Sequence, residues 1–367
     1  MKAIVDATEF SQALNKVIKV IKVNKKSVCP ELEGVLVQIE DGRCTLRATD
    51  FTTWLTTVIP AQGDDVGFVL WRPKDAAQAC CHFQGELILE TEEKIRGKNR
   101  CIQLTMFCEP RCAQIMALLP EDYPAMAEHQ SKYIYTVNAA RLLERVEHVK
   151  YTLYKPDPGI RAQGTHVQFD GNKVFALDGL RMAWDIDDGL TVRQPFMVLP
   201  EALEYLKFFG NQDITVSMGV NYLQMTDGTM SIQTRIEGPS VFNLDGAVPK
   251  EFTEEFYICP KDFLGELDYL KKLLLKTDKP YIYFSNGRLS MAAASGNYNT
   301  QVQIDGESSI GFGFDLRYMV DAIQQFRGES FVKMKVISSV APVILEAEGR
   351  SDCAMILPVR MKEAAAA

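Results

Sequence analysis

The sequence is poor in histidine and has no long apolar run. Only four histidines occur in 367 residues, and none lies in a recognisable catalytic setting. No stretch of about 18 uncharged apolar residues is present, and the N-terminus lacks the apolar core of a secretory signal. The motifs GxxxxGK[ST], GxGxxG, HExxH and GxSxG are absent, so nucleotide-binding, dinucleotide-binding, zincin and hydrolase activities lose their usual support. We expect a cytoplasmic protein with no membrane span, cofactor or catalytic site.

Cysteine is scattered, and its number, nine, is odd. Both features favour reduced thiols over a disulfide framework. Cys108 and Cys112, with Cys101 nearby, form the only group that suggests a metal, but no CxxC pair or His-rich motif accompanies them. We therefore expect no metal site.

Length and charge leave the class of protein open. A chain of 367 residues is too long for one ordinary core and predicts two or three domains. The formal net charge of −8 disfavours a nucleic-acid partner at first sight. Net charge does not decide the matter, however, if the cations are sorted onto one surface.

The sequence contains a threefold internal repeat. LRATDFTTWLTTVIPA around Asp50 matches VFALDGLRMAWDIDDG around Asp178 at an offset of 128 residues, and Phe68 matches Phe196 at the same offset. The proline-marked exits at Leu119 and Val248 lie 129 residues apart, and a weaker third copy follows.

Each copy predicts a helix, alternating strands, a strand leading into a second helix, and more strands. This is an α+β plan with helices packed on antiparallel sheet. We expect domains at 1–128, 129–251 and 252–361, followed by a tail at 362–367.

The first helix of each copy is amphipathic and cationic. Apolar residues share one face: Phe10, Leu14, Val17 and Ile21 in the first copy, Leu142, Val146 and Val149 in the second, and Phe263, Leu267, Leu270 and Leu274 in the third. The basic residues are expected to point outward: Lys16, Lys19, Lys22 and Lys26, then Arg141, Arg145 and His148, then Lys261, Lys272 and Lys276. Lys26 is expected near or beyond the helix end.

Charges on a solvated helix face are weak evidence when they occur once. Their recurrence in three equivalent helices of an acidic protein favours contact with nucleic-acid phosphates. No recognition-helix, zinc-finger or RNA-binding pattern indicates that bases are read. The acidic pairs Asp187-Asp188 and Glu254-Glu255 are expected in solvated turns.

Three short segments add a family resemblance. ALDGLRMA at 176–183, LLPEDYPAM at 118–126 and MILPVRM at 355–361 are each weak alone. In this order, inside a triplicated chain, they resemble the bacterial sliding clamp, the beta subunit of the replicative DNA polymerase. The resemblance covers essentially the whole chain.

The resemblance implies a processivity factor. Two three-domain subunits would close head to tail around double-stranded DNA, with helices lining the pore. Polymerases, the clamp loader and repair proteins would bind through short peptides in a cleft between the second and third domains. The cleft would form only if the chain end packs beside the DGLR turn, with Arg181 and Arg360 bonding the peptide. Its members would be Ala162, Leu177, Gly179, Leu180, Arg181, Met182, Pro342, Met355, Leu357, Pro358, Val359, Arg360 and Met361.

The sequence departs from the family in several places. Ala162 is small where a larger aliphatic residue is usual, and Leu180 replaces a polar residue, so peptide preference is expected to differ. GPSVFNLDGAVP stands where the family has a Phe-Pro-Asp-Tyr box. A paralogous or mobile-element clamp with an altered cleft is therefore the alternative, and an enzyme on a repeated α+β scaffold is the second class considered.

Overall fold

The computed structural model describes residues 1–22, 30–96, 99–154, 159–238, 240–276, 278–292 and 299–360. Two predicted site residues, Lys26 and Met361, lie outside these ranges, as does the tail at 362–367. Within the described ranges, no helix is long and apolar enough to cross a membrane.

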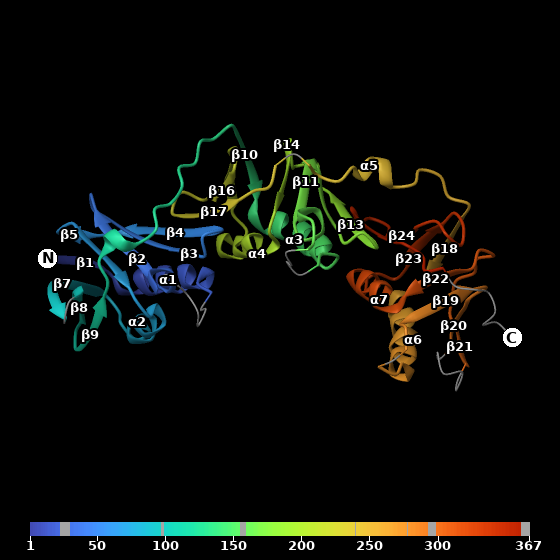
Figure 1. Ribbon diagram of the computed structural model, residues 1–367, viewed down its shortest axis with the longest axis horizontal. Helices are drawn as coiled ribbons and strands as arrows, with labels where there is room; N and C mark the ends of the chain where they lie inside the picture. The colour runs from blue at the N-terminus through green and yellow to red at the C-terminus, as the bar shows by residue number, and fades with distance from the viewer. Residues whose placement is uncertain are drawn as a thin grey trace. The chain divides into compact units, whose positions relative to one another are not determined.

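The same order of elements occurs three times (Figure 1): a strand, a helix, a group of strands, a second helix and three strands. The first copy contains β1 (Lys2–Asp6), α1 (Ala7–Val17), η1 (Ile18–Val20), η2 (Pro30–Glu33), β2 (Val35–Glu40), β3 (Arg43–Thr49), β4 (Thr53–Pro60), β5 (Gln62–Gly63), β6 (Val66–Leu70), α2 (Pro73–Cys80), β7 (Glu86–Arg96), β8 (Asn99–Cys108), β9 (Arg111–Ala117) and η3 (Pro120–Asp122). The second contains β10 (Tyr133–Asn138), α3 (Ala139–Lys150), η4 (Ala162–Gly164), β11 (Val167–Gly171), β12 (Lys173–Leu177), β13 (Arg181–Ile186), β14 (Val192–Val198), α4 (Pro200–Leu203), η5 (Glu204–Phe209), β15 (Asp213–Met218), β16 (Tyr222–Thr226), β17 (Met230–Arg235) and α5 (Leu244–Ala247). The third contains β18 (Glu254–Ile258), α6 (Pro260–Leu273), β19 (Tyr281–Ser285), β20 (Arg288–Ala292), β21 (Asn299–Gln303), β22 (Phe312–Asp315), α7 (Leu316–Gln325), β23 (Val332–Val336), β24 (Val343–Glu346) and β25 (Asp352–Ile356). The predicted α+β repeat is confirmed.

The chain divides into two compact units. Unit 1 comprises residues 1–140 and 204–236, and unit 2 comprises 141–203 and 237–367. Unit 1 holds the sheets β5-β1-β7-β8-β9 and β10-β15-β16-β17-β4-β3-β2-β6, and unit 2 holds β14-β11-β12-β13-β25-β24-β23-β18 and β21-β20-β19-β22. Each eight-stranded sheet therefore joins strands of two successive repeats. The three domain boundaries expected from the sequence remain a prediction.

Local geometry reproduces the repeat at the predicted offset. Asp50 Oδ1 accepts the backbone N–H groups of Thr52 and Thr53, at 3.1 and 2.9 Å. Asp178 Oδ1 accepts those of Leu180 and Arg181 in the same way, both at 2.9 Å. The two turns are thus equivalent at an offset of 128 residues.

The exits from the repeats correct one alignment. After its last strand, each repeat forms a single bridge to its own earlier strand: Val69 with Leu118, Met197 with Glu237, and Gly313 with Val359. Leu118 and Glu237 lie 119 residues apart, not 129. The alignment of Leu119 with Val248 was therefore wrong, because more residues separate the bridge from the proline in the second exit than in the first.

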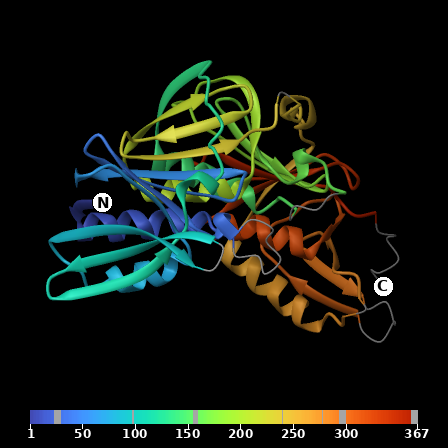
Figure 2. The same ribbon diagram turned by 60° about the vertical axis from the view of Figure 1, so that its left-hand side comes forward.

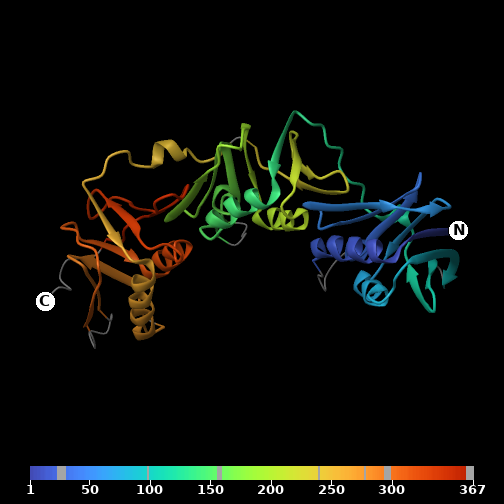
Figure 3. The ribbon, with the colours of Figure 1, turned by 180° about the vertical axis from the view of Figure 1, so that it is seen from behind.

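The predicted apolar helix faces are buried except at Ile21 and Leu274, which follow the helix ends and are half-buried. Phe10, Leu14 and Val17 of α1 have 0% exposure. Helix α1 lies against β3 and β4 in unit 1 (Figure 2). In unit 2, α6 packs beside α7 (Figure 3), and Leu267 of α6 is fully buried. Asp6 caps α1 by accepting the N–H groups of Thr8 and Glu9.

Candidate partner cleft and cationic helices

The cations of α1 and its extension differ in exposure. Lys16 is half-buried in the last turn of α1, whereas Lys19 is exposed in η1. Lys22 lies beyond both helices, and its ammonium group is 2.8 Å from Asp50 Oδ2. The first helix is therefore shorter than the sequence predicts. Of its predicted cations, Lys19 is the one that is exposed on the helical segment.

The cations of α6 are on the surface, as expected. Lys261 is exposed in the first turn, and Lys276 is exposed beyond the end of the helix. The Lys272 side chain is 72% exposed and pairs with Asp268, one turn away, at 2.7 Å. An exposed pair of this kind contributes little to stability and leaves the ammonium group accessible.

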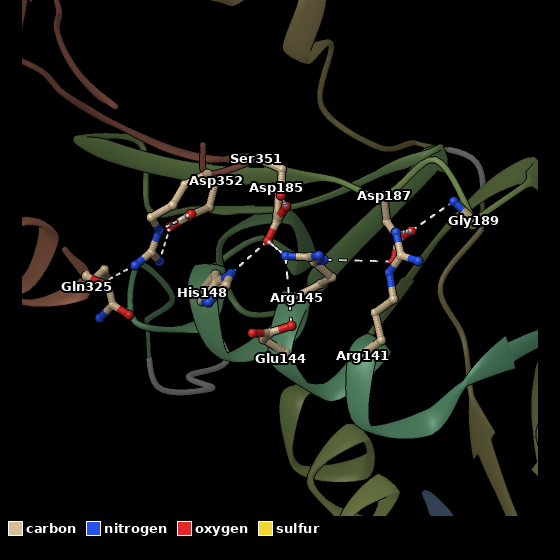
Figure 4. A network of polar contacts seen from close by, with 11 residues as sticks. Arg141, Glu144, Arg145, His148, Asp185, Asp187, Gly189, Gln325, Ser351 and Asp352 are labelled. Atoms are coloured by element: carbon tan, nitrogen blue, oxygen red, sulfur yellow. Dashed lines mark hydrogen bonds and ion pairs between the residues drawn. The ribbon is translucent and has the colours of Figure 1, made fainter. Parts of the chain in front are cut away.

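The cations of α3 form an ion cluster with β13 (Figure 4). Arg145 Nη1 lies 3.1 Å and His148 Nδ1 2.7 Å from Asp185 Oδ2. The Asp185 side chain is fully buried, and only 17% and 18% of the Arg145 and His148 side chains are exposed. Arg141 binds Asp187, which lies two residues further on, just beyond the end of β13.

This arrangement corrects two expectations. Arg145 and His148 do not point outward, because the carboxylate of Asp185 holds them against the sheet. Asp187 begins a turn, since its carbonyl accepts the Leu190 N–H, but it is 6% exposed and pairs with Arg141, so of the two acidic residues only Asp188 is solvated. A role of Arg141, Arg145 and His148 in DNA binding stays a prediction.

The cluster also connects two repeats within unit 2. In the antiparallel pairing of β13 with β25, the backbone of Asp185 lies opposite that of Asp352. The Ser351 hydroxyl donates a hydrogen bond to Asp185 Oδ1 at 2.7 Å. Burial by itself raises the pKa of Asp185, but the hydrogen bonds from His148 and Ser351 and the charge of Arg145 outweigh it and hold that pKa below its usual value. Asp185 therefore holds together α3, β13 and the start of β25.

The DGLR turn presents one apolar side chain. Gly179 has a φ of +88°, a conformation that glycine adopts without strain, and Asp178 fixes the two following N–H groups. Leu180 is consequently 48% exposed.

Arg181 is committed to protein contacts. Its guanidinium group donates to Asp178 Oδ2 at 3.1 Å, Asp321 Oδ2 at 2.5 Å and the Tyr151 carbonyl at 2.9 Å. It also lies 4.5 Å from the centre of the Tyr318 ring. Bonding a peptide would require Arg181 to leave these partners, so its role here is to hold the turn.

The chain end lies beside the turn, as the resemblance requires. In β13 and β25, Met182 pairs with Met355, and the Leu357 N–H donates to the Leu180 carbonyl at 2.9 Å. Met182 and Met355 are 2% and 7% exposed. They belong to an apolar cluster with Phe175, Trp184, Leu244 and Ile344, against which Val241 and Phe242 also pack.

The remaining predicted cleft residues lie on nearby segments. Leu177 is half-buried at the end of β12, and Ala162 begins η4, which lies beside β12. Leu357 is 36% exposed and Arg360 is exposed, while Ala162, Pro342, Pro358 and Val359 are half-buried. Sequence reasoning missed Phe242 and Leu244, whose only signal was their place in the segment that lacks the expected box.

The cysteines give no sign of a metal centre. Cys108 is buried and Cys112 exposed on the hairpin formed by β8 and β9. Among the described residues, no group of three metal-ligating side chains comes together.

Successive repeats share a sheet, and an apolar seam lies where the second repeat joins the third. This arrangement defines a clamp fold. No protein-family model matches the chain. Curated beta sliding clamps of Mycoplasma capricolum and Chlamydia muridarum are each 20% identical to it. These alignments cover 90% of the chain and 92% of the first relative, and 99% of the chain and 100% of the second.

A solved structure agrees. The putative DNA polymerase III beta subunit of Eubacterium rectale superposes with a TM-score of 0.83 at 17% identity, covering 98% of this chain and 99% of that one. Over nearly its whole length the chain is thus similar, at low identity, to beta sliding clamps, and it has the fold of the solved one.

Proposed function

We propose that the chain is a sliding clamp: copies close head to tail around duplex DNA and tether a replicative polymerase and other replication and repair proteins. The clamp would provide processivity without a catalytic site of its own, and two copies would complete the ring.

The observation that carries the proposal is an unpaired strand edge at each end of the repeat series. Within the chain, the last strand of one repeat pairs with the third sheet strand of the repeat before it: β17 with β4, and β25 with β13. The corresponding strands still available are β9 and β21. Each ends its own sheet among the described residues.

Pairing β9 of one copy with β21 of the next would form a third equivalent junction. Exposed strand edges offer unpaired backbone groups, which favours such pairing. Because the two surfaces differ, the contact is heterologous and requires a closed ring if it is not to form filaments. The family resemblance favours closure by two copies.

The exposed cations suit the inner surface of such a ring. Lys19, Lys261, Lys272 and Lys276 are all exposed on the surface. Phosphate contacts of this kind are independent of sequence and weaken with salt, which permits movement along DNA. We propose that retention depends on closure of the ring more than on these contacts.

The seam between β13 and β25 suits a short apolar peptide. Leu180 and Leu357 lie at its surface, above the buried pair of Met182 and Met355. Methionine adapts to different apolar partners, so one cleft can accept several related peptides. Polymerase and clamp-loader segments are the expected ligands.

Sedimentation equilibrium tests ring closure. We expect a mass of about twice 41.2 kDa at micromolar concentration in physiological salt. Ile115→Glu on β9 should weaken association at least tenfold, because it places a charge at the pairing edge. Ile134→Glu is the control: this residue is 68% exposed on β10, also a sheet edge but not one expected to pair. A monomeric wild type, or equal effects of the two variants, would contradict the proposal.

A further inference from the structure

The third repeat carries an aromatic ring, an ammonium group and a carboxylate in one row across its sheet. Strands β24, β23 and β18 follow one another at one edge of the eight-stranded sheet of unit 2 (Figure 1). Tyr257 of β18 pairs with Lys333 of β23, which pairs with Glu346 of β24. Paired residues lie on the same face of a sheet. Phe256 and Leu345, their neighbours along the strands, belong to the core, so this row lies on the opposite, outer face.

A cavity of about 960 Å³ lies at this row. Its lining includes Tyr257, Glu329, Phe331, Lys333, Glu346 and Glu348. We call this cavity the outer pocket. Strands β23 and β24 separate it from the turn at 337–342 that connects them, and therefore from the chain end and the seam of Met182 and Met355.

The two aromatic rings of the outer pocket are exposed. Tyr257 is 55% and Phe331 61% exposed, and exposed aromatic side chains beside a cavity are typical of an interaction site. The ring of Tyr257 already attracts a cation, because the Lys333 ammonium group lies 5.6 Å from its centre and 3.5 Å from Glu255 Oε2. The outer pocket thus combines the aromatic faces and carboxylates that bind organic cations.

The charge of the outer pocket favours a cationic ligand. Three of its lining residues are glutamates and one is a lysine. Glu329 pairs with Arg350 at 3.2 Å, and Glu346 pairs with Lys335 at 2.7 Å. Glu348 is exposed, and no cation of the described residues lies within ion-pair distance of it. Its carboxylate can therefore accept an incoming cation, whereas a nucleic acid or an anionic lipid would be repelled.

The fold itself does not require this row. The equivalent positions, two residues before the cap of the first helix and at its successive strand partners, are known in the other repeats from the pairing register. The first repeat has Ile4, Ile88 and Phe107 there. The second has Thr136, Thr215 and Thr226. Ring, ammonium and carboxylate occur together only in the third repeat, which indicates a local function.

We propose that the outer pocket binds an arginine side chain on a basic segment of a partner protein. A guanidinium group is planar, so it can stack on the exposed rings of Tyr257 and Phe331 and still direct N–H donors to Glu348. A lysine ammonium group is more strongly hydrated and lacks this fork of donors. The inference goes beyond the proposed clamp function and does not depend on whether the chain encircles DNA.

Fluorescence anisotropy with a labelled basic peptide tests the proposal. The probe is a seven-residue peptide in which three arginines alternate with glycine, so that the cations share one face when it is extended. The control probe has lysine in place of each arginine and carries the same charge. We expect saturable binding of the arginine probe by the full chain and binding about fivefold weaker for the lysine probe, because stacking is lost.

Matched protein variants locate the binding. Tyr257→Ala and Glu348→Gln should each weaken the arginine probe about fivefold, whereas Tyr257→Phe, which keeps the ring, should bind it as the wild type does. The controls are Tyr269→Ala, at a tyrosine of α6 that is 47% exposed, and Glu128→Gln, at an exposed glutamate of unit 1. Neither should change the affinity. Leu180→Asp in the seam should also leave it unchanged, which separates this site from the proposed polymerase cleft.

Four results would overturn the proposal. Absence of saturable binding would remove the site, and equal affinity for the two probes would reduce it to unspecific attraction of positive charge. Equal losses in the pocket variants and in the two controls would place the probe elsewhere. Dissociation of the oligomer by the probe would make a second copy, and not a partner protein, the occupant.

Discussion

Helices α1 and α3 occupy the same place in successive repeats, yet their cations have different surroundings. Lys19, just after α1, is exposed, whereas Arg145 and His148 of α3 contact the buried carboxylate of Asp185. The strand equivalent to β13 is β4, where Thr57 stands at the position of Asp185. A single carboxylate on a neighbouring strand thus converts a solvent-exposed cationic helix face into part of a buried ion cluster that connects two repeats.

Removal of that carboxylate should have the largest effect. Asp185→Ala leaves Arg145 and His148 half-buried without their main partner, so we expect a loss of about 3 kcal/mol in the free energy of unfolding. Asp188→Ala, at an exposed residue of the same strand end, should change it by less than about 0.5 kcal/mol. Urea denaturation measures both. Equal effects would show that the cluster contributes nothing to stability.

Replacement of Arg181 should have the next largest effect. Arg181→Lys keeps the charge but loses the forked contacts to Asp178 and Asp321 and the stacking on Tyr318, and we expect a loss of about 1–2 kcal/mol. The control is Arg317→Lys, whose exposed side chain pairs with Asp315 only two residues away. If both variants unfold at the same urea concentration as the wild type, the turn does not depend on Arg181.

Acid should weaken the cluster of α3 more than any part of α1. The pKa of Asp185 is held below its usual value, so its contribution is complete above the unfolded-state pKa of about 4 and is lost as pH falls through the lower folded-state pKa. Urea denaturation from pH 6 downward should therefore show a smaller acid-dependent loss for Asp185→Asn than for the wild type. Parallel stability curves for the two proteins would refute this assignment.

The exposed cations should affect DNA binding with little effect on folding. Charge reversal at Lys19 and Lys272 should reduce the salt dependence of binding to linear duplex by about one unit of log–log slope per lost phosphate contact. The free energy of unfolding should change by about 0.5 kcal/mol or less. Glu substitution at Lys250, an exposed lysine outside these helices, serves as the control. An unchanged slope in the double variant would mean that these helices do not face DNA.

The sequence predicted the repeat and the apolar helix faces because both depend on local periodicity. It also predicted that MILPVRM meets the DGLR turn, and the pairing of Met182 with Met355 confirms this. It could not predict the ion cluster, because Arg145 and Asp185 are 40 residues apart and nothing local marks them as partners. The contribution of Phe242 and Leu244 was missed for a related reason: their segment differs from the family pattern, and only the folded exit shows where they pack.

Retention on closed DNA tests the central claim most directly. The protein is assembled on a nicked circular duplex with a bacterial clamp loader, washed in high salt, and its release is followed before and after the circle is cut with a restriction enzyme. A ring held by topology should persist through the wash and leave rapidly once the DNA is linear, with Ile115→Glu lost from both forms. Release at the same rate from circular and linear DNA would show that the protein does not encircle its substrate.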